Sequence, residues 1–415
     1  MVHQTIAMKM NKASKASSKI RPMQKPHFLT RRPHWASFWM AAIVGMLSAC
    51  SVAPVAQDPP APGPSAANPS APALVTVDDS RPLPPVLVRA QSRWVPVRWS
   101  ELPGVDTDAV NEAWPAWLQS CQLSGPEWKP LCPEIAQLAN ASPELQRRWM
   151  REKLQPYRVE AQDQRNVGLL TGYYEPTLVG ARRPQGAFQV PLYAPPAQLS
   201  PRKPWFTRQE METSSAARAA LRGKELLYLA DPVDAMVLHI QGSGLVNVTE
   251  PDGRQRWVRM AFAATNNQPY KSIGRWLLDR QLIRDASWPG IKAWIDRNPS
   301  RVDELLWQNP RVVFFREEAL PVGSLPPGPK GAQGVPLTAE RSIAVDRRSI
   351  PYGTPVWMKS TGPQTNLDRL VLAQDTGTAI VGAVRADYYA GSGPAAGELA
   401  GRLKQPLQMW ALWPR

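Results

Sequence analysis

The segment SIAVDRRSIPYGTPVWM, residues 342–358, and the segment LVLAQD, residues 370–375, decide the fold class of this chain. Both consist of short apolar runs that end at Gly, Pro or Asp, a pattern typical of β-strands. We expect strands at Ser342–Asp346, Thr354–Met358 and Leu370–Asp375. Strands this short and this closely spaced indicate a barrel rather than a parallel sheet with helical crossovers.

The residues before this region mix helices with short strands. From about residue 90 to 160 the pattern is helical, and Ser142-Pro143-Glu144 combines an N-cap hydroxyl, a first-turn proline and an acid near the positive end of the helix dipole. After Val167 the pattern changes to short apolar strands broken by Gly, Pro and Asn/Asp.

Further along, we expect a strand, a turn and a second strand over Val233–Val248. Two helices are expected near Ser272–Ile283 and Pro299–Gln308. The whole pattern predicts a mainly β fold with flanking helices.

The N-terminus has the organisation of a bacterial lipoprotein leader. A basic region (Lys9–Arg32) precedes ten apolar residues (Phe38–Leu47), which are too few to span a bilayer. The string Leu47-Ser48-Ala49-Cys50 resembles a lipobox, which predicts a signal peptide over 1–49 and a lipidated Cys50; the alternative is a chance cysteine after a weak transmembrane helix. Ser51, rather than Asp, after the cysteine indicates sorting to the outer membrane of a Gram-negative cell, facing the periplasm.

A spacer and a globular part follow the leader. Residues 51–75 hold seven Pro and seven Ala, so we expect a linker over residues 50–89. The net charge is +15, but residues 1–49 carry eight Lys or Arg and no acid. The mild positive charge that remains would suit an acidic cell-wall polymer or an anionic membrane. An exported location argues against nucleic acid.

Composition excludes several kinds of site. Three of the four histidines lie in the leader, so only His239 remains and a multi-histidine metal site is excluded. Phosphate-binding glycine motifs are absent. Cys121 and Cys132 either form a disulfide, which an oxidising compartment favours, or remain as two free thiols.

Two groups of polar residues could carry chemistry. The string TGYYEP (171–176) places Thr171, Tyr173 and Glu175 on one strand, and HIQGSG (239–244) contains Gln241 and Ser243. Two positions apart in a strand, Gln241 and Ser243 would face the same side. His239 itself, in a mostly apolar segment, is expected to be a packed histidine.

Three aspartates form the second group. Asp346 precedes Arg347 and Arg348 and is expected to form an ion pair. Asp375 precedes Thr-Gly, which is typical of an Asx turn. Asp387 precedes two tyrosines and a Gly-Ser-Gly loop, the best position for an accessible acid.

In combination these strings resemble the membrane-bound lytic murein transglycosylase A family with its C-terminal three-aspartate domain. The matching strings run in order from about residue 90 to the end: TGYYEP, DPVD, HIQGSG, PYKSIGRWL, NPRVVFF, GVPLTAERSIAVDRRSIPYGTPV and AQDTGTAIVGAVRADYYAGSGPAAGELAG. Thr378, where the family commonly has glycine, and His239, where many members have another polar residue, depart from the pattern.

The resemblance implies a double-psi β-barrel domain over 90–175 and 305–415. A second β domain would be inserted at 176–304, with a groove for a glycan strand between the two. The implied reaction cleaves the β-1,4 bond between N-acetylmuramic acid and N-acetylglucosamine of peptidoglycan and leaves a 1,6-anhydromuramic acid end. No cofactor is implied, and a wall-synthesis or wall-hydrolysis complex is a further expected partner.

The resemblance implies that Asp387 is the single catalytic acid and base. The expected groove-lining or supporting residues are Asp375, Asp346, Thr171, Tyr173, Glu175, Gln241 and Ser243. Because Asp387 must hold a proton, its pKa should be raised, and we expect Arg385 to turn away toward another acid. The alternatives are a non-catalytic peptidoglycan-binding lipoprotein and a hydrolytic glycosidase, for which Glu175 or Asp346 would supply a second carboxylate.

Overall fold

The computed structural model describes residues 81–320, 327–363 and 365–415. The predicted signal peptide, the lipidation site Cys50 and most of the predicted linker lie outside the described residues. Within the described part, every helix is too short or too polar to cross a membrane.

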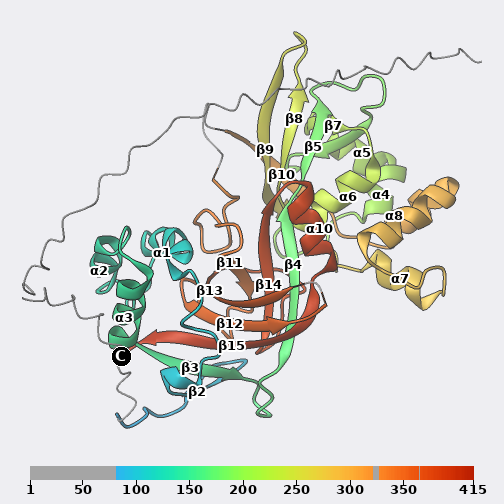
Figure 1. The fold of residues 1–415 in the computed structure, drawn as a ribbon. Coiled ribbons are helices and arrows are strands. Elements are labelled where there is room, and N and C mark those ends of the chain that lie inside the picture. Colours follow the sequence, from blue (N-terminus) through green and yellow to red (C-terminus); the bar gives the residue numbers. More distant parts are fainter. Residues whose placement is uncertain (1–80, 321–326, 364) are drawn as a thin grey trace, which may run out of the picture. The chain divides into compact units, whose positions relative to one another are not determined.

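Among the described residues, the first of two sheets has nine strands in the order β1-β2-β3-β15-β12-β13-β11-β14-β4. Figure 1 labels each of them except β1. Its strands are β1 (Leu87–Val88), β2 (Arg93–Pro96), β3 (Leu154–Glu160), β4 (Gly168–Glu175), β11 (Ser342–Val345), β12 (Pro355–Thr361), β13 (Asn366–Asp375), β14 (Arg385–Ser392) and β15 (Lys404–Pro414). The three strands expected from residues 342–375 are therefore confirmed.

An additional pairing bends this sheet into a nearly closed barrel. Strand β15 pairs with β4 as well as with β12 and β3, so β4, β14, β11, β13, β12 and β15 form a ring. Side chains of alternate residues fill its interior, among them Leu170 of β4 and Ala386 and Tyr388 of β14. Since successive side chains of a strand point to opposite faces, Thr171, Asp387 and their like-facing neighbours lie on the outside of the barrel.

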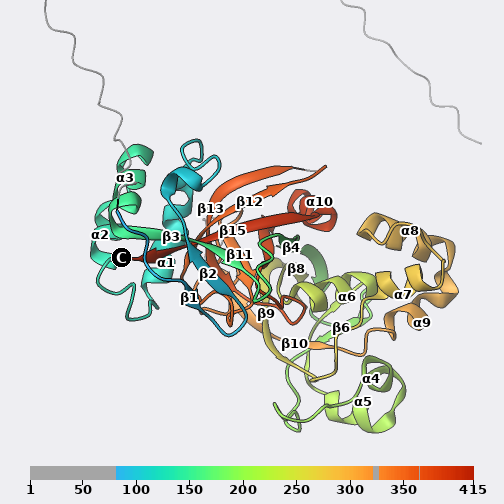
Figure 2. The same ribbon diagram turned by 90° about the horizontal axis from the view of Figure 1, so that it is seen from below.

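Helices cover another part of the barrel. The helices α1 (Trp114–Cys121), α2 (Cys132–Gln137) and α3 (Pro143–Lys153) lie together in both views (Figures 1 and 2). Their tryptophans pack with Trp357 of β12 and Trp410 of β15 in one buried cluster. A disulfide of 2.05 Å joins Cys121 to Cys132. Helix α3 begins as expected, because Ser142 accepts a hydrogen bond from the Leu145 amide.

In the described part of the chain, the second sheet has six strands in the order β10-β9-β8-β5-β7-β6. Its strands are β5 (Thr177–Ala181), β6 (Val190–Tyr193), β7 (Glu225–Leu229), β8 (Gly244–Thr249), β9 (Gln255–Thr265) and β10 (Val313–Ala319). The accompanying helices are α4 (Arg208–Thr213), α5 (Ser215–Leu221), α6 (Pro232–Gln241), α7 (Ile273–Asp279), α8 (Trp288–Arg297) and α9 (Val302–Leu306), and α10 (Pro394–Arg402) follows β14. Because β10 pairs with β9, the second sheet continues past the predicted boundary at residue 304.

The predicted strand at the start of Val233–Val248 is wrong, because Pro232–Gln241 forms helix α6. The Asp231 carboxylate caps the helix by accepting a hydrogen bond from the Val233 amide at 2.7 Å, and Pro232 occupies the first turn. Gly242 ends the helix with φ of 85°, a conformation that favours glycine. Gln241 is thus the last residue of a helix and Ser243 lies in the following turn, so the two do not share a strand face.

Candidate active site

Two parallel neighbouring strands place the predicted acid beside its polar partners. Asp387 of β14 lies opposite Thr171 of β4, and Tyr389 lies opposite Tyr173. All four side chains point away from the barrel interior. They form two adjacent rows. The first row contains the Thr171 hydroxyl and the Asp387 carboxyl, and the second contains the phenol rings of Tyr173 and Tyr389, whose centroids lie 5.3 Å apart.

The Asp387 carboxyl is held by one side-chain hydrogen bond. The Thr171 hydroxyl donates to Oδ1, while Oδ2 has no hydrogen-bond partner among the described residues. Burial raises the pKa of Asp387 above its ordinary value, against smaller lowering effects of the Thr171 hydrogen bond and the Arg385 guanidinium. Asp387 therefore has both an unoccupied oxygen and a reason to retain a proton.

The expectation that Arg385 turns toward another acid is wrong. Its guanidinium donates to the Thr171 hydroxyl at 2.8 Å and to the carbonyl oxygens of Leu169 and Ala386. Because its hydrogen-bond acceptors are neutral oxygens, Arg385 remains near Asp387 without forming an ion pair with it. The Arg385–Thr171 hydrogen bond also orients the threonine hydroxyl toward the carboxylate.

The Asp375 carboxylate is occupied on both oxygens. The Tyr173 hydroxyl donates to Oδ2 and the Ala332 amide donates to Oδ1, each at 2.9 Å. Burial raises the pKa of Asp375 to about 6, and the nearby Asp387 adds to the increase. Asp375 thereby fixes the position of the Tyr173 ring.

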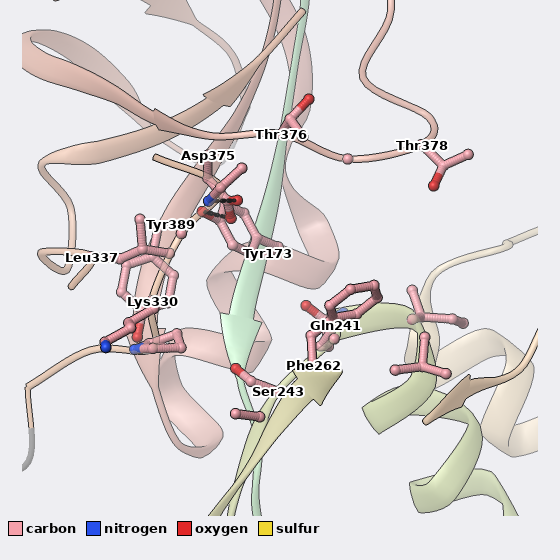
Figure 3. Close-up of a pocket in the computed structure, with 18 of the residues that line it drawn as sticks. Tyr173, Gln241, Ser243, Phe262, Lys330, Leu337, Asp375, Thr376, Thr378 and Tyr389 are labelled. Carbon is pink, nitrogen blue, oxygen red and sulfur yellow. Dashed lines mark hydrogen bonds between the residues drawn. The ribbon is translucent and has the colours of Figure 1, made fainter. Parts of the chain in front are cut away.

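A cavity of about 520 Å³ opens beside the second row. Figure 3 shows that its walls come from both sheets: Tyr173, Asp375 and Tyr389 from the barrel, Gln241, Ser243 and Phe262 from the second sheet and its helix. Thr171 and Asp387 lie two residues earlier on the same strands and are not among its lining residues. Gln241 accepts a hydrogen bond from the Tyr174 amide at 3.0 Å, which joins α6 to β4.

Two of the predicted groove residues serve other contacts. Glu175 is 1% exposed, and its carboxylate pairs with the Arg259 guanidinium at 2.6 Å. It also accepts hydrogen bonds from Ser243 and Ser392. Glu175 is therefore not among the residues that line the cavity beside Tyr173, and it connects β4 with β9 of the second sheet.

Asp346 forms the ion pair expected from its neighbouring arginines. Its carboxylate contacts the Arg348 guanidinium at 3.1 Å and accepts from the Gly382 amide at 3.1 Å. These contacts lower the pKa of Asp346, although burial acts in the opposite direction. It borders an adjoining cavity of about 520 Å³ that shares Ala332, Thr376 and Gly377 with the cavity beside Tyr173. Its role as a groove-lining or supporting residue stays a prediction.

Comparisons with known proteins agree with this arrangement. Residues 169–316 match the model of the MltA specific insert domain, and residues 341–413 match that of the 3D domain. The membrane-bound lytic murein transglycosylase A of Escherichia coli strain K12 is 32% identical over 268 residues, which cover 62% of this chain and 68% of that protein. The chain spans about two thirds of the length of the curated relatives it matches.

The chain belongs to the membrane-bound lytic murein transglycosylase A family.

Solved structures of this lytic transglycosylase family share the fold. The lytic transglycosylase LtgG of Burkholderia pseudomallei is 43% identical and has a TM-score of 0.55, with 80% of this chain and 98% of that chain covered. The E. coli MltA structure with bound chitohexaose is 25% identical with a TM-score of 0.61, and the coverage is 81% and 95%.

Sequence reasoning missed several residues that line the cavity of this transglycosylase-family member. Phe262 is 47% exposed on β9, and Lys330 lies on the segment between the two sheets. Tyr389 could have been found, because it lies two positions after Asp387 on the same strand face. Phe262 had no comparable signal, since its neighbours in sequence are the buried core of β9. In the described part of the chain, no cluster of His, Cys, Asp and Glu could hold a metal ion.

The raised pKa of Asp375 predicts a pH dependence of folding stability. A carboxyl whose pKa is 3.8 unfolded and about 6 folded contributes stability that is full below pH 3.8 and is lost as pH rises through about 6. Asp375→Asn cannot ionise, so its stability relative to wild type should increase as pH rises from 4 to 7.5. Urea unfolding at several pH values measures this. Asp163→Asn is the control: it removes an exposed carboxylate whose pKa the Arg165 hydrogen bond lowers, so it should not show this increase. Parallel curves for wild type and Asp375→Asn would contradict the prediction.

Proposed function

We propose that this chain cleaves the β-1,4 bond between N-acetylmuramic acid and N-acetylglucosamine in peptidoglycan and leaves 1,6-anhydromuramic acid ends. The observation that supports this most directly is the Asp387 carboxyl, which has a raised pKa and one unpartnered oxygen. The E. coli relative with bound chitohexaose supports glycan strands as the ligand class.

One carboxyl is sufficient for such a reaction. Protonated Asp387 would give its proton to the glycosidic oxygen as the bond to the anomeric carbon breaks. The C6 hydroxyl of the same sugar then attacks that carbon, and the Asp387 carboxylate takes its proton. Because the nucleophile is tethered to the reacting ring, proximity replaces the second carboxyl that glycosidases use.

The remaining site residues would position the substrate. Tyr173, Gln241 and Ser243 offer hydroxyl and amide groups to sugar hydroxyls in a groove between the two domains, and Asp375 holds Tyr173 in place. A second cavity of about 500 Å³ shares Tyr174 with the first, so the binding surface would continue along a polymer. We place a double-psi barrel domain at 90–175 with the C-terminal residues, and the inserted domain from 176 to the end of β10.

The contacts of the other carboxylates favour this reaction over hydrolysis. A hydrolase needs a second free carboxylate near the first. Glu175 is paired with Arg259 and Asp346 with Arg348, so neither is available.

The product sugar distinguishes the three functions. Purified sacculi are digested with the protein and the fragments are identified by mass spectrometry. Transglycosylation gives anhydro ends, hydrolysis gives ends that contain a water molecule, and a binding module releases nothing. Only the first result is compatible with the proposed function.

We also propose that acylation of Cys50 anchors the protein to the outer membrane on its periplasmic side. The Pro- and Ala-rich residues after Cys50 would let the enzyme reach the wall, where a wall-synthesis or wall-hydrolysis complex is a further partner.

The charge of Arg385 should influence the pH above which activity is lost, because it lowers the pKa of Asp387. The rate should fall as pH rises through the pKa of Asp387, because the reaction starts from the protonated acid. Arg385→Met removes a cation that lowers this pKa, so the alkaline limb of the pH–rate profile should shift upward. Arg385→Lys keeps the charge and serves as the matched control. A limb that does not move in Arg385→Met would contradict Asp387 as the acid.

A further inference from the structure

His239 lies in the cavity wall with one ring nitrogen engaged by a buried arginine. It is on helix α6, lines the cavity beside Gln241, and its ring stacks on Phe315 of β10 with the centroids 5.5 Å apart. Its Nδ1 lies 3.0 Å from Nη2 of Arg208. The stacking on Phe315 and the contact with Arg208 together fix the orientation of the His239 ring.

Arg208 determines which nitrogen of the ring carries the proton. Its side chain is buried, and it donates to the carbonyl oxygens of Asn309 at 3.2 Å and Arg311 at 2.9 Å. Burial lowers the pKa of Arg208 to about 10, so it remains a cation at neutral pH. A guanidinium only donates hydrogen bonds, so Nδ1 must accept and the proton of the neutral ring is on Nε2.

The ring is also held neutral. Burial, followed by the Arg208 charge, lowers the pKa of His239 well below its ordinary value. Its Nε2 has no hydrogen-bond partner among the described residues, and His239 borders the cavity. The result is an N–H donor of fixed position that is available to a ligand.

The cavity wall next to this donor is suited to one kind of group. Apolar side chains line the cavity together with His239: Ile240, Ala261, Phe262 and Val313. The His239 N–H beside these apolar side chains complements an acetamido group, whose carbonyl oxygen accepts a hydrogen bond and whose methyl group packs on apolar surface. The cations Arg311 and Arg316 also line the cavity. A free amine would place a positive charge against an apolar wall backed by Arg208.

We propose that His239 recognises an N-acetyl group of the glycan through Nε2–H, and that Arg208 is a positioning residue that fixes the tautomer. This inference rests on the proposed glycan substrate and goes beyond it, because it assigns selection for N-acetylated over de-N-acetylated sugars to one side chain.

Binding of defined oligosaccharides tests the proposal. Asp387→Asn protein, which cannot turn over the ligand, is titrated with chitin hexasaccharide and with its de-N-acetylated form in a calorimeter. His239→Phe keeps an aromatic ring against Phe315 but lacks the donor. It should bind the acetylated ligand about tenfold more weakly, and the de-N-acetylated ligand with unchanged affinity. Tyr228→Phe, which removes a hydroxyl from β7 outside the cavity, is the matched control. Equal affinities of His239→Phe and its parent for the acetylated ligand, or equal losses for both ligands, would overturn the proposal.

The tautomer is a second, independent readout. In ¹⁵N spectra of the free protein at neutral pH, His239 should be neutral and protonated on Nε2. Arg208→Met should produce a mixture of tautomers and reproduce the weaker binding of the acetylated ligand, whereas Arg208→Lys should restore both. A charged or Nδ1-protonated ring in the wild type would refute the assignment. Absence of glycan cleavage by the wild type would refute the proposed function, while the binding data would still decide this proposal.

Discussion

Replacement of Asp387 by asparagine should reduce the rate of glycan cleavage by about a thousandfold or more. The variant retains the shape of the side chain and can still contact the Thr171 hydroxyl, but it can neither give nor take a proton. General acid and base catalysis each contribute on the order of 10²–10⁴ to a rate, and in the proposed reaction one residue performs both roles.

The experiment requires that folding and binding remain intact. Release of soluble fragments from sacculi measures the rate, and sedimentation with sacculi measures binding, which we expect to be unchanged. Asp368→Asn, on strand β13 and paired with Lys359, is the matched control and should retain activity. Full activity in Asp387→Asn would refute the site assignment.

Loss of Arg259 should be the most destabilising substitution among those considered. Its guanidinium contacts both oxygens of Glu175, at 2.6 and 3.2 Å, and the two side chains are 5% and 0% exposed. Arg259→Met would leave a buried carboxylate without its counter-ion, which costs about 3–5 kcal/mol of unfolding free energy. Denaturant unfolding measures this cost.

Two further variants identify the cause of that loss. Arg275→Met removes one partner of an exposed pair with Asp279 on helix α7 and should cost less than about 1 kcal/mol. Adding Glu175→Met to Arg259→Met removes the unpaired charge and should recover part of the stability. If the double variant is as unstable as the sum of the two single ones, the ion pair is not the cause.

The barrel strands could be predicted from the sequence because their signals are local. Short apolar runs bounded by Gly, Pro and Asp identified β11, β12 and β13. The same criteria failed at Pro232–Gln241, where an N-cap aspartate and a first-turn proline outweighed the strand-like apolar run. The flanking string DPVD contained that signal, and a test for helix caps would have found it.

The site was predictable as a set of residues but not as a set of contacts. The strings around Thr171 and Asp387 placed both on strands, and alternation then gives the face on which each lies. The Glu175–Arg259 pair joins residues 84 positions apart in the chain, and nothing local to either residue indicates the other. Arg385 likewise found neutral acceptors on β4, which are visible only once β4 and β14 are known to be neighbours.

The parallel pairing of β4 with β14 joins segments 216 positions apart, such as Thr171 and Asp387. Closing so long a loop costs more entropy than forming the hairpin between β8 and β9, which only residues 250–254 separate. We therefore expect the six-stranded sheet to form early during refolding. The barrel strands, which precede and follow that sheet in the chain, should pair later. On this route the Thr171–Asp387 contact is among the last to form, so recovery of activity should lag behind recovery of secondary structure.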